Sequence, residues 1–112
     1  MEWFRVYGEV VHDRKLRRIA AKMECPMAEV IGVWVTFLAA ANESTPRGTL
    51  PDYQPEDLAA TLQMGLGRAK KFITAFGAAG LFSPDGIKQW ETRQFSSDSS
   101  TERVQKHRNA SV

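Results

Sequence analysis

The segment that most constrains the fold spans residues 54–90, where the patterns of two helices and a hairpin follow one another without a spare residue. The first helix is expected over residues 55–63 and the second over residues 68–79. Two glycines in the turn between them permit unusual backbone angles, and Leu66 is expected to fill the angle between the helices. Residues 83–86, Ser-Pro-Asp-Gly, are typical of a tight turn between two short strands. Helix, turn, helix and hairpin in this order predict a helix-turn-helix followed by a wing.

The residues before this segment predict one extended stretch and two further helices. Residues 3–11 are rich in aromatic and β-branched side chains, which favours a short strand whose aromatic residues pack in the core or against the wing. Asp13 is a good N-cap for a helix over residues 14–24. A longer helix over residues 27–41 is apolar around most of its circumference, so it is expected to be the core helix. With a very short strand at residues 49–50, the predicted fold is mainly α with a small β-hairpin, a winged helix-turn-helix.

A chain of 112 residues is about one domain's worth. Residues 1–92 are expected to form this domain, and residues 93–112 a polar, basic tail that is either a linker to a second domain or a short helix near residues 101–108. No apolar run approaches the roughly 20 residues that cross a bilayer, so a cytoplasmic protein without a membrane partner is expected. Cys25 is the only cysteine and the two histidines lie far apart, so neither a metal site nor a cofactor is predicted.

Charge is distributed unevenly along the chain. Residues 1–25 carry a net charge of +2, residues 26–67 a net charge of −4, and residues 68–112 a net charge of +4. A molecule with two basic flanks and an acidic middle can present one face to a polyanion.

The cations gather in the first helix, at the start of the helix over residues 68–79, and in the tail. A cation cluster at a helix N-terminus works against the helix dipole, but it suits a phosphate partner. Beyond that basic start the helix continues with Ala75, Gly77 and Ala78, which offer few groups for reading base edges, so it suits the DNA backbone better. Solvated helix faces are the alternative reading of the same cations. The candidate DNA-binding residues are Arg68, Lys70, Lys71, Thr74, Lys88, Arg14, Lys15, Arg18, Arg103, Lys106 and Arg108.

The sequence WETRQFSSDSSTERVQKHR at residues 90–108 resembles the segment that follows the winged-helix domain in phage and prophage replication initiation proteins of the replisome-organiser and DnaD-like type. The opening residues 3–7, the basic first helix and the wing at Leu81 are also similar, so the resemblance covers about residues 3–108. It implies the DNA-binding N-terminal domain of a longer protein that binds origin DNA, duplex DNA in our expectation, or other replication proteins. It also implies a role in loading a replicative helicase, and self-association through the winged helix.

Three other functions are weighed against DNA binding in replication. In the first, the domain is a protein-interaction or oligomerisation module that docks a helicase or a helicase loader through the surface of Trp34 and Phe37. In the second, it is a transcriptional regulator with the same fold, against which only the tail motif argues. An enzyme is not expected, because no nucleophile–base set or pair of carboxylates stands at an interpretable spacing.

Overall fold

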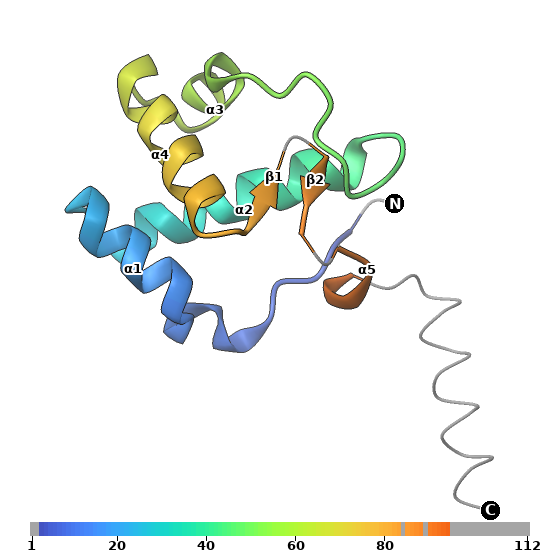
Figure 1. Ribbon diagram of the computed structural model, residues 1–112, viewed down its shortest axis with the longest axis horizontal. Coiled ribbons are helices and arrows are strands. Elements are labelled where there is room, and N and C mark those ends of the chain that lie inside the picture. Colours follow the sequence, from blue (N-terminus) through green and yellow to red (C-terminus); the bar gives the residue numbers. More distant parts are fainter. Residues whose placement is uncertain (1–2, 84, 89, 95–112) are drawn as a thin grey trace, which may run out of the picture.

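The computed structural model describes residues 3–83, 85–88 and 90–94, without the side chains of Thr92 and Arg93. This part of the chain is mainly helical and contains a small two-stranded antiparallel sheet (Figure 1). The elements in order are the 3-10 helix η1 (Gly8–His12), α1 (Arg14–Met23), α2 (Met27–Glu43), α3 (Pro55–Leu62), α4 (Leu66–Ala78), β1 (Phe82–Ser83), β2 (Gly86–Ile87) and α5 (Trp90–Arg93). The predicted tail lies outside the described residues from residue 95 onward.

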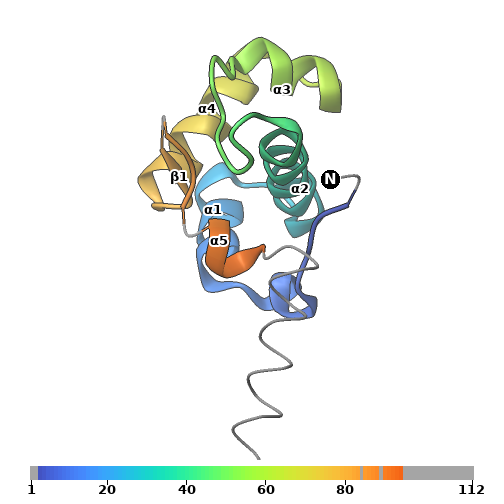
Figure 2. The same cartoon turned by 90° about the vertical axis from the view of Figure 1, so that its right-hand side faces the viewer.

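Helix α2 crosses the middle of the molecule, with α3 and α5 on opposite sides of it in both views (Figures 1 and 2). Phe37 of α2 is the centre of the core and is fully buried. Its ring lies 5.1 Å from Phe76 of α4, 5.0 Å from Phe82 of β1 and 5.6 Å from Tyr53 in the loop before α3, measured between ring centroids. Aromatic pairs at such distances add to the stability gained by burial. One side chain therefore ties the core helix to three other parts of the fold.

Trp34 and Phe37 do not offer the self-association surface expected from the sequence. Trp34 stacks on Phe76 at a centroid distance of 6.1 Å and is 5% exposed, and Phe37 is 0% exposed. Because α1, α3, α4 and the hairpin pack on α2 from several directions, the part of its apolar surface that carries these two side chains lies inside the fold. The sequence-based expectation for these two residues is wrong.

Helix α1 follows its predicted pattern closely. A side-chain oxygen of Asp13 accepts a hydrogen bond from the backbone N–H of Leu16 at 3.0 Å, which confirms the predicted N-cap. Leu16, Ile19 and Ala20 are buried, and the intervening cations are exposed. An amphipathic helix is thus laid on the core with its basic face outward.

The N-terminal segment forms no strand within the described residues. Trp3 and Tyr7 are 45% and 40% exposed, so the expectation that they pack in the core or against the wing is wrong. Instead of a neighbouring strand, the side-chain amide of Gln94 pairs with the backbone of Arg5 by accepting from its N–H and donating to its carbonyl oxygen. A strand needs a partner edge, and here one glutamine side chain takes the place of that edge.

The connection between α3 and α4 differs from the predicted glycine turn. Helix α3 starts as expected, since the Asp57 carboxylate accepts a hydrogen bond from the backbone N–H of Gln54 at 2.8 Å. The left-handed residue that ends it is Gln63, with φ 56°, whereas Gly65 has φ −66°. Leu66 is already the first residue of α4 and is 41% exposed, so it does not fill the angle between the helices.

The hairpin pairs Phe82 with Ile87 and packs on the loop that follows α2. The backbone N–H of Ile87 donates to the carbonyl oxygen of Gly48 at 2.9 Å. The strand predicted at residues 49–50 does not form in the described chain, although this bond lies where it would have joined the sheet. Trp90 packs on the same loop at Gly48: it is 7% exposed and lies beneath the guanidinium of Arg47, 5.2 Å from the ring centroid.

Candidate nucleic-acid interface

Helices α1 and α4 pack against each other on the left-hand side of Figure 1. The spacing of apolar residues in α4 predicts a buried stripe of Ala69, Phe72, Ile73 and Phe76, with Ala75 toward solvent. Ala69, Phe72 and Phe76 are buried, but Ile73 is only half-buried and Ala75 is 4% exposed. Ala75 is small enough for α1 to lie close to α4 at this position. Because both helices bury their apolar faces in this way, their polar edges meet at the surface.

Two open hollows lie between these polar edges and share Lys22 and Ala75, so together they form one groove. We call it the α1–α4 groove. Along this groove α1 and α4 run antiparallel, since Lys22 lies opposite residues 70–75 and Lys15 lies opposite residues 75–79. Its lining residues are Lys15, Arg18, Ile19, Lys22, Met23, Lys70, Lys71, Thr74, Ala75, Ala78 and Ala79.

The α1–α4 groove is strongly cationic. Five of its lining residues carry a positive charge and all five are exposed, and none of the lining residues that the structure describes is acidic. Within the described residues these cations form no ion pair. Unpaired positive charges gathered along one groove attract a polyanion. The five are Lys15, Arg18, Lys22, Lys70 and Lys71.

Arg68 stands apart from this group, although the sequence placed it there. Its guanidinium forms two hydrogen bonds with the Glu29 carboxylate of α2, Nε to Oε1 at 2.6 Å and Nη2 to Oε2 at 2.8 Å. It also lies over the ring of Phe72 at 5.3 Å from the centroid. The hydrogen bond from Arg68 lowers the pKa of Glu29. The positive charge of Arg68 is thereby balanced by Glu29. Arg68 connects α4 to α2 and does not line the groove.

The other predicted DNA-binding residues fall into three groups. Thr74 is exposed and lines the groove beside Lys70 and Lys71. Arg14 is exposed on α1, and Lys88 follows β2, but neither is among the described residues that line the groove. The three cations of the tail lie outside the described residues: Arg103, Lys106 and Arg108.

The uncharged part of the groove is aliphatic. Its floor consists of Ile19, Met23, Ala75 and Ala79, Ala78 lies at its edge, and the lining residues that the structure describes include no aromatic ring. The exposed side of α4 continues with glycine and alanine, at Gly67, Gly77 and Ala78. The described exposed side of α4 carries no asparagine, no glutamine and no unpaired arginine, the side chains that read base edges by paired hydrogen bonds. Arg18, the unpaired arginine among the described lining residues, belongs to α1. The groove can hold phosphates, and α4 offers little for reading a sequence.

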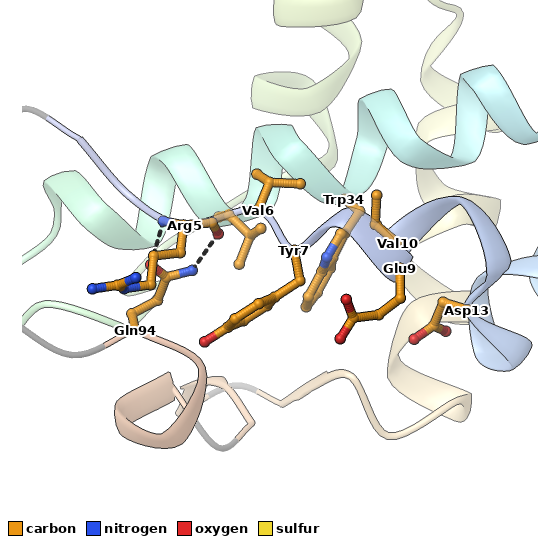
Figure 3. A pocket seen from close by; sticks show the side chains of 9 residues that line it. Arg5, Val6, Tyr7, Glu9, Val10, Asp13, Trp34 and Gln94 are labelled. Carbon is orange, nitrogen blue, oxygen red and sulfur yellow. Dashed lines mark hydrogen bonds between the residues drawn. The ribbon is translucent and has the colours of Figure 1, made fainter. Parts of the chain in front are cut away.

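A separate pocket of about 120 Å³ lies between the N-terminal segment and α2. Figure 3 shows Tyr7 beside Trp34, with the carboxylates of Glu9 and Asp13 on one side and the Arg5–Gln94 pair on the other. Its lining mixes acidic, basic and aromatic groups, and Asp13 already caps α1. This pocket lies where the N-terminal segment packs against α2 and Gln94, and it has room for a few water molecules.

Comparisons with protein-family models, with curated proteins and with solved structures each return no match. Among the described residues no single helix is long and apolar enough to cross a membrane; α1 and α2 satisfy that test only together, across a bend of 117°. In the same part of the chain no three histidine, cysteine or carboxylate side chains gather as a metal site would require.

Proposed function

We propose that this chain is a winged-helix domain that binds duplex DNA through the sugar-phosphate backbone. The observation that carries the proposal is the α1–α4 groove, where two helices distant in sequence bring five cations to one surface, none of them in an ion pair with another described residue. Each cation that neutralises a phosphate releases condensed counterions, which favours binding at moderate salt.

The order of elements supports the winged-helix part of the proposal. Helix α2, the loop at Gly48, α3, α4 and the β1–β2 hairpin follow one another as in that fold, with α1 as an additional helix beside α4. The hydrogen bond between Ile87 and Gly48 stands in for the third strand of the small sheet. In this assignment α4 is the recognition helix and the hairpin is the wing.

Duplex DNA is a better fit to the groove than single-stranded DNA. Proteins that bind unpaired strands stack the bases on aromatic side chains, each worth about 1–3 kcal/mol per base. The described lining of the groove consists of lysines, Arg18, Thr74 and aliphatic side chains, and it contains no aromatic ring on which a base could stack. We therefore propose backbone contacts with low sequence preference.

The biological setting we propose is replication initiation, of the phage replisome-organiser or DnaD-like type. Its support is the resemblance of residues 90–108, most of which lie outside the described residues. DNA binding and the replication setting are separate parts of the proposal, because a transcriptional regulator would bind DNA with the same fold.

The test is a series of duplex-binding titrations at several salt concentrations, comparing the wild-type chain with the double variant Lys70→Gln and Lys71→Gln. Glutamine keeps helix propensity and length while removing the charge. Loss of two phosphate contacts should reduce the slope of log affinity against log salt by about 1.8, at about 0.9 per contact. A single-stranded probe of the same length should bind more weakly than the duplex at every salt concentration.

The matched control is Arg14→Gln with Arg17→Gln, which removes the same charge from exposed positions of α1 outside the groove lining. Its slope should change much less than that of the lysine variant. An unchanged slope for the lysine variant, or equal losses in both variants, would show that the groove is not where DNA binds. Tighter binding of the single strand would overturn the duplex assignment.

A further inference from the structure

A second open groove lies on the other side of α4, between this helix, the hairpin and the loop before α3. We call it the α4–hairpin groove; it encloses about 640 Å³, room for several side chains. Thr74 and Ala78 form a ridge between this groove and the α1–α4 groove, since each of the two residues lines both grooves. Its lining residues are Leu50, Asp52, Tyr53, Gln54, Ile73, Thr74, Gly77, Ala78, Phe82 and Ser83.

The floor of the α4–hairpin groove is apolar. Leu50 is buried, and Tyr53, Ile73 and Phe82 are half-buried, so part of each of these three rings or side chains faces the groove. Burial raises the pKa of Tyr53 to about 12, which keeps its phenol neutral. Gly77 carries no side chain at the edge, which permits close approach of another backbone. A partner would gain mainly by burying apolar side chains here.

The rim of this groove is acidic. Asp52 lines it, and Asp57 lies beside it, because the Asp57 carboxylate accepts a hydrogen bond from the backbone N–H of Gln54, a lining residue, at 2.8 Å. Both carboxylates are exposed. None of the lining residues that the structure describes is a cation. An apolar floor with an anionic rim repels phosphate and complements a partner that combines apolar and cationic side chains. The two grooves on either side of α4 therefore differ in the class of molecule they suit.

We propose that the α4–hairpin groove docks a cationic amphipathic helix of a partner protein. The apolar face of such a helix, with side chains spaced at i, i+3 or i+4, and i+7, enters the groove between α4 and the hairpin. Its lysines or arginines meet the rim at Asp52 and Asp57. This interaction surface replaces Trp34 and Phe37, which are buried, and it goes beyond DNA binding.

The probe is a fluorescein-labelled helical peptide of leucine and lysine, about 15 residues long, with leucines on one face. Two further peptides serve as comparisons: one with glutamate in place of every lysine, and one with the same leucine and lysine content in scrambled order. We expect the full chain to bind the first peptide at least about tenfold more tightly than either comparison, with affinity that falls as salt rises. Amide chemical-shift changes should fall on residues 50–54 and 73–78 and on Phe82.

Two variants locate the binding. The double variant Asp52→Asn and Asp57→Asn removes rim charge without touching the packed floor. Asparagine tolerates the φ of 56° at residue 52, and at residue 57 its side-chain oxygen can still accept the hydrogen bond from the Gln54 N–H. This variant should weaken the peptide by about threefold to tenfold. Ile73→Thr removes an apolar contact and keeps the β-branch, and it should weaken binding by at least about fivefold. The matched control is Val11→Thr, an exposed apolar residue of η1 outside this groove, which should bind as the wild type does.

Equal binding of all three peptides would overturn the proposal, as would shift changes centred on the α1–α4 groove or equal weakening by the control. Should Ile73→Thr fail to fold, the rim variant and the shift map still decide. The variant Lys70→Gln with Lys71→Gln should keep wild-type peptide affinity. Failure of DNA binding is thereby distinguishable from failure of this docking surface.

Discussion

The hairpin packs on the loop after α2 through Gly86, and replacing this residue with alanine tests that contact directly. A Cβ at residue 86 would lie 2.2 Å from the carbonyl oxygen of Gly48 and 2.7 Å from the Cα of Thr49. Both neighbours are backbone atoms, so neither can turn away as a flexible side chain would. Gly86→Ala must therefore push the hairpin and the loop apart.

Two terms set the size of the effect. Gly86 has φ 133°, a conformation that L side chains rarely adopt, and an alanine there costs about 1–3 kcal/mol. Separation of the two segments also breaks the 2.9 Å hydrogen bond from Ile87 to Gly48, which contributes about 1 kcal/mol. The expected loss of unfolding free energy is about 2–4 kcal/mol. With an m-value of about 1.5 kcal/mol/M in urea, the unfolding midpoint should fall by about 1.3–2.7 M.

Urea unfolding followed by circular dichroism measures this loss, and Gly80→Ala is the matched control. Gly80 also has a positive φ, 74°, but a Cβ there would meet no atom within 4 Å. Its variant should lose only the backbone term, about 1–2 kcal/mol. Equal losses in the two variants would refute the reasoning, because they would mean that the contact of the hairpin with Gly48 carries no energy.

Two further predictions concern ionisable groups. Because Arg68 lowers the pKa of Glu29, the pair stabilises the fold above the ordinary carboxyl pKa of 4.5 and loses that contribution as pH falls through the lowered value. Glu29→Gln should flatten the pH dependence of the urea unfolding midpoint below about pH 4.5. It should also free Arg68 to contact a phosphate, which would steepen the slope of log duplex affinity against log salt by up to about 0.9. A slope equal to that of the wild type would mean that Arg68 makes no contact with DNA. The pKa of Tyr53 is raised from 10.0 to about 12, so stability should fall as pH rises between these values, when the unfolded chain has lost the phenolic proton and the folded one has not. Tyr53→Phe should abolish this loss of stability, as thermal melting between pH 9 and pH 12 would show. At pH 7 the same substitution should leave the free energy of unfolding nearly unchanged, because the buried hydroxyl has no hydrogen-bond partner among the described residues.

Periodicity predicted which residues of a helix face outward more reliably than it predicted what those residues meet. Asp13 caps α1 and its cations are exposed, as the spacing indicated. The buried stripe of α4 differs from the prediction at two residues: Ala75 is buried where α1 packs on α4, and Ile73 is only half-buried. Convergence of the two basic faces on one groove depends on how α1 packs against α4, and no spacing within either helix contains that information.

Long-range pairing explains the remaining differences. Glu29 and Arg68 are 39 residues apart, so the loss of Arg68 from the cation cluster had no local sign in the sequence. Trp34 and Phe37 look like a partner surface when α2 is considered alone, and they are core once α4 and the hairpin cover them. At Gln63 the local rule itself gave the wrong residue. Glycine is the usual left-handed residue at a helix end, but here the position is taken by glutamine. Hydrogen bonds at the helix end, such as that from the Met64 N–H to the Ala59 carbonyl oxygen at 3.0 Å, stabilise this conformation.

The ridge of Thr74 and Ala78 is narrow, since an α-helix with its side chains is only about 10–12 Å across. A DNA duplex seated against α1 and α4 and a protein helix seated against α4 and the hairpin would both need space above this ridge. Occupation of one groove therefore restricts the other on steric grounds. With the two occupants proposed above, DNA and the partner helix would exclude each other from the domain.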